Sequence, residues 1–299
     1  MKRSFNYTRK PAWIRMSLLT NRDFNTIKKR VGERSLTTVC EEARCPNIHE
    51  CWGEHRTATF MILGDTCTRR CRFCAVKTGI PGEVDLAEPL RVARTISEMG
   101  AAHAVITMVN RDDLDDGGAA VMAATVRKVH ELSPDCSVEV LSSDLMGDKK
   151  SLEIMMDAEP EIMSHNLETV RRLTSGVRSR SDYDRSLGFL RMVKEIDPQK
   201  LTKSSLMLGL GEEKHEVLQT MDDLRAVGVE IINLGQYLQP GRTNLPVVRY
   251  WEPEEFDELK NAALHRGFLH CESGPMVRSS YHAGDQYQLI RQRLLRERA

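Results

Sequence analysis

The sequence predicts an α/β protein in which repeated strand–helix units form one parallel sheet. Short apolar runs rich in β-branched residues alternate with amphipathic segments over most of the 299 residues. The runs have strand length and the segments have helix length, which favours βα units over a helical bundle. The hydrophobic content of 40% is ordinary for a globular protein, and no apolar run approaches the ~20 residues of a membrane span. We therefore expect one large domain with extensions at its ends.

The elements follow in a regular order along the chain. A helix is expected over 22–38, with Asn21 or Asp23 as its N-cap. Six strands are expected, over 60–63, 103–109, 137–141, 161–164, 204–210 and 230–234. The helices between and after them are expected over 88–99, 118–132, 149–157, 168–173, 184–196, 213–226 and 253–266. Crossovers between parallel strands are right-handed, so these helices pack against the sheet.

Six of the eight cysteines lie between residues 40 and 74, in two triplets of different spacing. The first triplet is Cys40-x4-Cys45-x5-Cys51, and the second is Cys67-x3-Cys71-x2-Cys74. Thiolates are soft ligands that suit zinc, copper and iron–sulfur clusters. A four-iron cubane has four corners, and each triplet supplies three local thiolates. Each site would therefore recruit a distant fourth ligand or leave one iron open for chemistry.

Three simpler interpretations of the cysteines are open. Disulfides are one, but residues 1–5 are polar and basic, so we expect no secretory leader and a cytoplasmic location. The second triplet also matches one face of a helix, although Gly64 and Asp65 break the preceding strand and Thr68-Arg69-Arg70 is too basic for buried packing. Zinc ribbons use two C-x2-C pairs, and two unequal triplets fit that pattern poorly. Iron–sulfur clusters are favoured over zinc.

The charge balance excludes some functions. Lysine and arginine equal aspartate and glutamate in number, so the formal net charge is zero. No electrostatic case exists for binding nucleic acid or a membrane surface.

The motifs resemble a known family. Cys67-Thr68-Arg69-Arg70-Cys71-Arg72-Phe73-Cys74 resembles the signature of radical S-adenosylmethionine enzymes, in which an aromatic residue precedes the last cysteine. The first triplet, set shortly before it, is similar to the auxiliary-cluster signature of the lipoyl synthase family. A C-terminal Arg278-Ser279-Ser280-Tyr281 matches the motif that supplies a serine ligand in that family. By this resemblance Ser280 is the fourth ligand of the auxiliary cluster, and Ser279 is the alternative.

The resemblance implies a fold and a division of the chain. The expected fold is a partial (β/α)6 TIM-like barrel with N- and C-terminal extensions that carry the auxiliary cluster. Residues 1–56 would form the N-terminal extension with Cys40, Cys45 and Cys51. Residues 57–266 would form the barrel, and 267–299 the C-terminal extension with the serine ligand.

Contacts to S-adenosylmethionine are also implied. Gly117 and Gly118 would receive its amino group, and Lys203 its carboxylate. Asn166 would hydrogen-bond the ribose, Glu168 would lie beside it in the first helical turn, and Gln236 would contact the adenine or the substrate chain. Simpler readings are open here too, because a Gly-Gly turn, a capping asparagine and a solvated lysine are common.

The activity implied by the resemblance is radical insertion of two sulfur atoms at carbons 6 and 8 of a protein-bound octanoyl-lysine. It requires two 4Fe–4S clusters, of which the auxiliary one is the sulfur donor, and two molecules of S-adenosylmethionine, cleaved to methionine and 5′-deoxyadenosine. The implied partners are octanoylated lipoyl-carrier domains of the glycine cleavage H protein or 2-oxoacid dehydrogenase E2 type. A ferredoxin or flavodoxin would donate electrons, and an iron–sulfur carrier would rebuild the cluster.

Some residues lie outside these motifs. Cys136 and Cys271 are expected to be buried or half-buried thiols. His49 and His55 are open as metal ligands, but with enough cysteines and the serine available, roles around the ligands or at the surface are favoured. A helical tail over 286–299 carries Arg291, Arg293, Arg296 and Arg298, which predicts a solvated helix or a contact to an acidic carrier. Two other classes are open, namely a methylthiotransferase with two clusters and a non-catalytic zinc protein. The chain lacks the length for the appended binding domains of the first.

Overall fold

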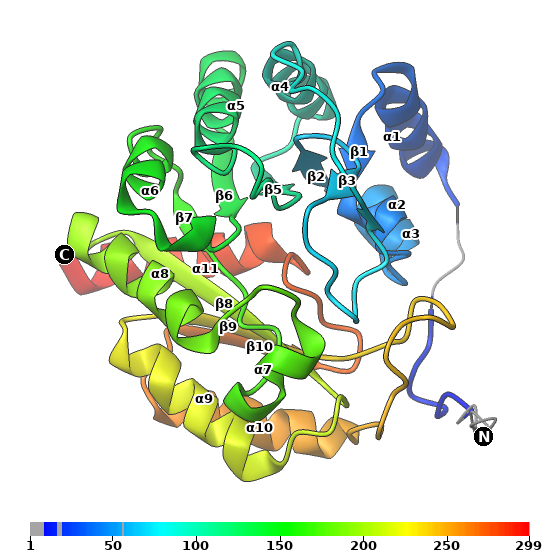
Figure 1. Ribbon diagram of the computed structural model, residues 1–299, viewed down its shortest axis with the longest axis vertical. Coiled ribbons are helices and arrows are strands. Elements are labelled where there is room, and N and C mark those ends of the chain that lie inside the picture. The colour runs from blue at the N-terminus through cyan, green and yellow to red at the C-terminus, as the bar shows by residue number, and fades with distance from the viewer. Residues whose placement is uncertain (1–8, 17–19, 56, 299) are drawn as a thin grey trace.

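One curved sheet forms the centre of the molecule (Figure 1). The computed structural model describes residues 9–16, 20–55 and 57–298. In spatial order the eight strands of the sheet are β1 (Thr37–Thr38), β2 (Thr59–Ile62), β5 (His103–Met108), β6 (Ser137–Leu141), β7 (Ile162–Ser164), β8 (Leu201–Leu208), β9 (Ile231–Gln236) and β10 (His270–Gly274). Strand β1 is antiparallel to β2, and every other neighbouring pair is parallel. Strands β1 and β10 are unpaired edges, so the sheet is a partial barrel, as predicted.

The six predicted strands are present, and the sheet has a seventh parallel strand. Strand β10 pairs in register with β9, from His270 opposite Ile231 to Gly274 opposite Gly235. The sequence of β10, His-Cys-Glu-Ser-Gly, contains no β-branched residue, so its strand signal is weak. Part of the segment predicted as a C-terminal extension therefore belongs to the barrel sheet.

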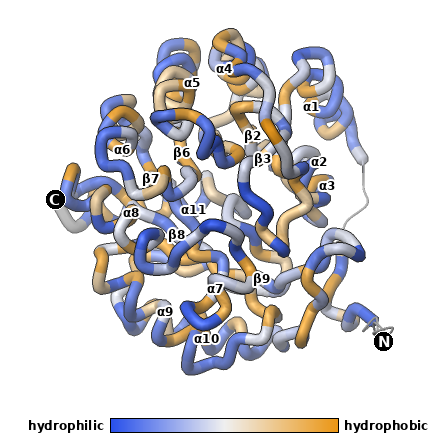
Figure 2. Tube along the Cα trace, in the orientation of Figure 1, coloured by the Kyte–Doolittle hydropathy of each residue, from blue (hydrophilic) through white to orange (hydrophobic). Residues whose placement is uncertain are grey.

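Helices surround the sheet on its outer face (Figure 1). They are α4 (Glu88–Met99), α5 (Ala119–Leu132), the short 3-10 helix η1 (Leu145–Gly147), α6 (Lys149–Met156), α7 (Arg171–Val177), α8 (Tyr183–Ile196), α9 (Lys214–Ala226) and α10 (Pro253–His265). Hydrophobic and hydrophilic stretches alternate along the outer helices, as amphipathic helices on a barrel require (Figure 2). Helix α4 has the predicted bounds because Pro89 lies in its first turn and Gly100 ends it with φ of 64°.

The start of α7 differs from the prediction. A helix was expected over 168–173, with Glu168 in its first turn and Asn166 as a cap. The helix begins at Arg171, and Glu168 has φ of 66°, in the left-handed region that a right-handed helix excludes. The backbone of Glu168 instead bonds to β8, through Ser205 and Met207. Glu168 is half-buried, and backbone strain of this kind is common at functional sites.

Extensions cover the two remaining openings of the barrel. Helices α1 (Arg22–Glu33), α2 (Val39–Glu42) and α3 (Ile48–Gly53) lie beside β1 at the open edge. Helix α1 begins after the predicted cap, Asn21, and ends before residue 38 because β1 occupies 37–38. At the other end of the chain, α11 (Ala283–Arg298) packs through Ile290 against the first residues of β7, β8 and β9. Every helix among the described residues is too short or too polar to cross a bilayer.

Candidate active site

The second cysteine triplet lies in one loop at the C-terminal end of the barrel. Cys67 ends the short strand β3 (Thr66–Cys67), and Cys71 and Cys74 follow before β4 (Lys77–Thr78). The sulfur of Cys67 accepts a hydrogen bond from the backbone of Arg69 at 3.4 Å, and that of Cys74 accepts one from Val76 at 3.4 Å. Such N–H···S contacts are typical of iron–sulfur ligands. The triplet is not on a helix face, which removes that alternative.

A buried arginine anchors this loop, contrary to the prediction that Arg69 is too basic to be buried. Arg69 is 3% exposed. Its guanidinium donates to the Asp112 carboxylate at 2.8 Å and to the Asp144 carboxylate at 2.7 Å. Burial lowers the pKa of Arg69, but the two carboxylates outweigh it and raise that pKa overall. The loop between Cys67 and Cys71 is thereby tied to the loops after β5 and β6.

The first triplet lies between the N-terminal helices and the barrel. Cys40 is in α2, Cys51 is in α3, and Cys45 lies in the connection between them. Burial and the neighbouring Cys45 raise the pKa of Cys40 to about 11. Burial, Cys40 and Cys45 likewise raise the pKa of Cys51. The thiols therefore oppose one another's ionisation, and all three line one cavity.

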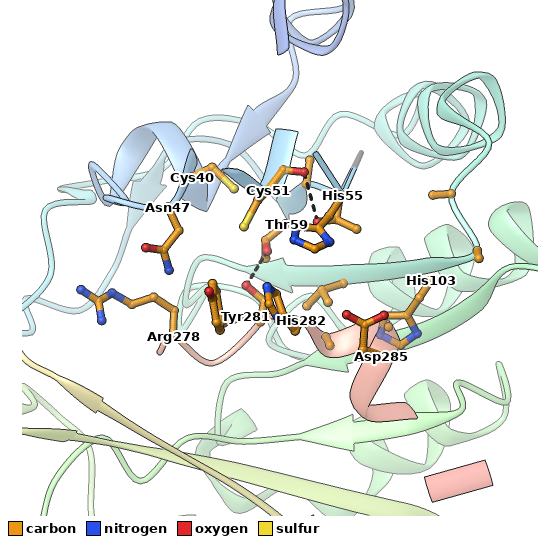
Figure 3. A pocket seen from close by; sticks show the side chains of 18 of the residues that line it. Cys40, Asn47, Cys51, His55, Thr59, His103, Arg278, Tyr281, His282 and Asp285 are labelled. Atoms are coloured by element: carbon orange, nitrogen blue, oxygen red, sulfur yellow. Dashed lines mark hydrogen bonds between the residues drawn. The ribbon is translucent and has the colours of Figure 1, made fainter. Parts of the chain in front are cut away.

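The C-terminal motif faces the first triplet from the opposite side (Figure 3). Ser280 lines the same cavity as Cys40, Cys45 and Cys51. The hydroxyl of Thr59 donates to the Ser280 hydroxyl at 2.7 Å. Ser279 lies outside that cavity's lining, and its carbonyl accepts from the side chain of Asn233. The placement favours Ser280 over Ser279 as the fourth ligand.

Further contacts hold this motif in place. The Asn47 amide donates to the Met276 carbonyl at 2.7 Å, and the Tyr281 hydroxyl donates to the Glu50 carboxylate at 2.8 Å. The backbone also approaches closely, because a Cβ at Gly235 would lie 2.0 Å from the Val277 carbonyl oxygen. Only glycine fits there, and the segment before Ser280 is therefore packed directly on β9.

Five of the six cysteines of the two triplets, all but Cys51, line one cavity of about 540 Å³. Cys40, Cys45 and Ser280 line one side of it, and Cys67, Cys71 and Cys74 line the other. Apolar side chains also line this cavity, including those of Met61, Val109, Leu141 and Val277. The fold thus brings cysteines of both triplets to one cavity, and we call the apolar part of its lining the apolar passage.

Three of the residues predicted to contact S-adenosylmethionine, namely Asn166, Glu168 and Gln236, line this cavity. Asn166 and Glu168 lie there together, and the Asn166 amide donates to the Glu168 carboxylate at 3.0 Å. Burial raises the pKa of Glu168, while Arg178 opposes that shift. Arg178 also lines the cavity and lies near the Cys71 thiol, whose pKa it lowers against the larger effect of burial. The sequence gives no signal for Arg178, because this residue lies just beyond α7 and belongs to no local motif.

The other predicted contacts lie elsewhere or are already engaged. Gly117 and Gly118 do not line the cavity, and a Cβ at Gly118 would lie 2.2 Å from Leu63. Lys203 is 1% exposed, and its ammonium pairs with the Glu139 carboxylate at 3.0 Å inside the barrel. Gln236 lines the cavity, but its amide donates to three backbone carbonyls and its oxygen accepts from Trp251.

The donor sets fit iron–sulfur clusters. All eight cysteines are free thiols, which removes the disulfide alternative. One site offers three thiols and a hydroxyl, and the other offers the three thiols of a single loop. Three thiolates leave one corner of a cubane for another ligand. Cys136 and Cys271 are buried away from both sites, as predicted.

Comparison with known proteins identifies relatives over nearly the whole chain. Residues 61–224 match the model of the radical SAM superfamily. A lipoyl synthase from Oceanobacillus iheyensis is 59% identical over 286 residues, which cover 96% of this chain and 91% of that protein. A lipoyl synthase from Shouchella clausii is 60% identical over 280 residues, covering 94% and 91%. A lipoyl synthase from Bacillus mycoides is 56% identical over 293 residues, covering 98% of both chains.

Solved structures of distant proteins share the fold. Methylornithine synthase (PylB) is 12% identical, with a TM-score of 0.55 over 83% of this chain and 81% of that one. HydG, a maturase of the FeFe hydrogenase, is 14% identical, with a TM-score of 0.57 over 71% of this chain and 50% of that one. At such low identity the likeness supports the partial barrel alone.

Proposed function

The chain belongs to the lipoyl synthase family of radical S-adenosylmethionine enzymes, and from this premise we propose how its residues divide the reaction. The enzyme inserts two sulfur atoms at carbons 6 and 8 of an octanoyl chain amide-linked to a lysine of a carrier protein. It uses two 4Fe–4S clusters and cleaves two molecules of S-adenosylmethionine to methionine and 5′-deoxyadenosine. The convergence of cysteines from both triplets, together with Ser280, on one cavity carries the proposal.

Cys67, Cys71 and Cys74 hold the resident cluster. With S-adenosylmethionine bound, this cluster supplies one-electron cleavage of the sulfonium, which generates the radical needed to break an unactivated C–H bond. The chain's own part is to fix the three thiols in one loop, which Arg69 ties to Asp112 and Asp144. Three local ligands leave room for S-adenosylmethionine at the site.

Cys40, Cys45, Cys51 and Ser280 hold the second cluster, which is a substrate because it gives up its sulfur. The serine oxygen is a harder ligand than thiolate and suits iron–sulfur clusters less well. Ser280 is therefore the ligand most readily released when the cluster is taken apart. Thr59, whose hydroxyl donates to Ser280, holds that oxygen in position.

Asn166, Glu168 and Arg178 bind S-adenosylmethionine beside Cys71. The Arg178 guanidinium is a buried positive charge that suits the methionine carboxylate. The Glu168 carboxylate suits the ammonium or ribose hydroxyls, and Asn166 orients it. We assign no such contact to Gly117, Gly118 or Lys203, which lie outside the cavity, or to the side chain of Gln236, which is saturated by backbone contacts.

The apolar passage positions the octanoyl chain between the two sites. Carbons 6 and 8 carry no acidic proton, so no side chain can activate them by acid–base chemistry. The cavity's contribution is to hold the chain and to keep out solvent that would quench a carbon radical. Met61 and Val277 are among the apolar residues that line this cavity.

The carrier protein docks at a basic opening over the radical site. A second hollow beside Cys71 and Cys74 is lined by Arg44, Arg70, Arg72 and Arg180, and within the described part of the chain no carboxylate lines it. All four arginines are exposed, so an acidic carrier surface complements this opening. The basic tail lies elsewhere, since α11 packs on the opposite ends of the strands.

The remaining partners follow from the reaction. The carrier is a lipoyl domain of the glycine cleavage H protein or of the 2-oxoacid dehydrogenase E2 type. A ferredoxin or flavodoxin supplies the electrons, and an iron–sulfur carrier rebuilds the second cluster. Free thiols require a reducing compartment, which supports a cytoplasmic location.

The test is anaerobic turnover with an octanoyl-lysine carrier peptide, S-adenosylmethionine and a reductant. The expected result is brown protein with about eight irons per chain, a lipoyl product, and two 5′-deoxyadenosines per product. A colourless protein that contains zinc, or cleavage of S-adenosylmethionine with a methylthio product on another substrate, would contradict the proposal.

A further inference from the structure

Two histidines and a glutamate converge beside the first cysteine triplet. The Glu50 carboxylate lies 3.2 Å from Nε2 of His282 and 3.9 Å from Nε2 of His55. One ligand atom from each of the three residues lies within 4.8 Å of the others. The rings of His55 and His282 are also in contact, with centroids 4.5 Å apart (Figure 3).

The three side chains come from both ends of the chain. Glu50 lies in α3, His55 follows that helix, and His282 directly precedes α11. The backbone of His282 has φ of 50°, an uncommon conformation for a residue with a side chain. The Tyr281 hydroxyl donates to the Glu50 carboxylate at 2.8 Å and so orients it. Partners of this kind commonly fix metal-binding carboxylates.

Two imidazoles and one carboxylate form a metal-ligand set. This combination binds divalent zinc and iron and leaves further coordination positions open. Magnesium and calcium prefer sites made entirely of oxygen. An ion about 2.1 Å from each donor can bridge donors up to about 4.2 Å apart, so both contacts of Glu50 with the histidines fit one ion.

We propose that Glu50, His55 and His282 form a third metal site, which binds a single divalent iron at the edge of the auxiliary-cluster cavity. His55 and His282 line that cavity together with Cys40, Cys45, Cys51 and Ser280. His55 is exposed, so the site faces solvent as well as the cavity. It lies between the cluster and the outside.

The position of this third metal site beside the auxiliary-cluster cavity suits it to hold iron that the second cluster releases. Removal of sulfur from the second cluster leaves iron without its bridging sulfide, and that iron must leave and later return. The site holds ferrous iron during this exchange. This role rests on the proposed function, because it requires that the second cluster is consumed, whereas the binding of an ion by the three residues does not require it.

The binding test uses holoenzyme that contains both clusters, with manganese(II) as the probe. The oxidised clusters are silent in electron paramagnetic resonance, so loss of the free manganese signal measures binding directly. One manganese per chain is expected to bind to the intact protein and to be displaced by ferrous iron. The variants Glu50→Gln and His55→Ala should each weaken binding by at least tenfold.

A matched control is His130→Ala. His130 forms an isolated pair with Glu161 at 3.4 Å and has no second histidine ligand. Its removal should leave manganese binding unchanged. Iron and sulfide content, measured first, shows that each variant has folded around its clusters. If His55 alone destabilises the fold, His55→Gln keeps the size of the side chain and loses the imidazole.

The results separate the possible failures. No bound manganese in the intact protein, or equal binding in Glu50→Gln and His55→Ala, would overturn the third site. Binding at the three residues, together with a cluster that stays intact through turnover, would preserve the site and refute the sulfur-donor role. Binding at the site with slower cluster rebuilding in His55→Ala is the result expected.

Discussion

The two cysteine sites differ in how far apart in the sequence their residues lie. Cys67, Cys71 and Cys74 lie in one loop, and backbone N–H groups of the same loop contact two of their sulfurs. The first triplet is spread over α2, α3 and their connection. Ser280 lies beside it, and its hydrogen-bond partner Thr59 is 221 residues away in the sequence. One site is local, and the other is closed by the two ends of the chain.

This difference matches what each site must do. A resident cofactor needs ligands that stay together through every cycle, and a single anchored loop supplies them. A cluster that is consumed needs ligands that separate and reassemble. A fourth ligand on a distant segment, held by a few hydrogen bonds from Asn47, Thr59 and Tyr281, can move without unfolding the barrel.

The largest expected effect comes from the local site. Cys71→Ala should abolish formation of 5′-deoxyadenosine, because two thiolates do not hold the cluster that S-adenosylmethionine requires. The second cluster should remain, at about four irons per chain. Chromatography of anaerobic reactions with dithionite measures the first effect, and iron analysis measures the second. Persistent reductive cleavage would show that the local triplet is not the radical site.

The distant site should give a different phenotype. Cys45→Ala should still cleave S-adenosylmethionine under reducing conditions but insert no sulfur, because the sulfur source is lost while the radical site is intact. Mass spectrometry of the octanoyl-lysine peptide checks this directly. A normal lipoyl product from this variant would exclude the second cluster as the donor.

The serine tests whether ligand release matters. Ser280→Ala should lose sulfur insertion and keep some hydrogen abstraction. Ser280→Cys should hold the cluster at least as firmly, because thiolate suits iron better than a hydroxyl oxygen, and should turn over slowly. Ser279→Ala is the matched control. Wild-type sulfur insertion by both Ser280 variants would remove this residue from the mechanism, and a loss in Ser279→Ala alone would move the ligand by one position.

Local signals explain what the sequence predicts well. The predicted cap Asn21 begins α1, and α4 has its predicted bounds, since the signals that start and end a helix act within one helical turn. The cysteine spacings likewise indicate two metal sites, since each triplet is defined within a few residues. Strand β10 and the left-handed backbone of Glu168 have no local sequence signal. Pairing with β9 imposes the first, and backbone hydrogen bonds to β8 impose the second.

Long-range contacts account for the residues that were misplaced. Arg69 is buried because Asp112 and Asp144 neutralise its charge, and these partners lie 43 and 75 residues away in the sequence. Lys203 faces the barrel interior because Glu139, 64 residues earlier, neutralises it there. No spacing rule within a motif can reveal either pair. The binding role proposed for Arg178 depends in the same way on distant residues that line one cavity with it.

A smaller effect is expected at Arg178. Replacement by Gln should raise the KM for S-adenosylmethionine roughly 10- to 100-fold, the range expected for loss of a charge-assisted contact worth about 1.5–3 kcal/mol. Lys203→Met serves as the contrasting variant, because Lys203 does not line the cavity. It should lower thermal stability by leaving Glu139 unpaired, with little change in KM. A KM that rises for Lys203→Met and not for Arg178→Gln would restore the predicted role of Lys203.

The smallest effect concerns the basic opening, which adjoins the local site only. Cys71 and Cys74 line it, whereas Cys40, Cys45 and Cys51 do not. Reversing two of its charges, in Arg70→Glu with Arg180→Glu, should lower kcat/KM for an acidic carrier protein roughly five- to tenfold at low salt, since charges at an interface rim act mainly on association. The effect should shrink as salt rises.

Two controls make this result specific. A short octanoyl-lysine peptide reaches the cavity without docking, so its kcat/KM should not change in the double variant. Charge reversal on the exposed tail, in Arg291→Glu with Arg296→Glu, should leave the carrier reaction unchanged, because α11 lies at the opposite end of the barrel. Equal slowing of peptide and carrier would mean that Arg70 and Arg180 support the radical loop itself. Slowing by the tail variant alone would move the docking surface to α11, and the carrier would then have to reach the cavity from the side of the distant cluster.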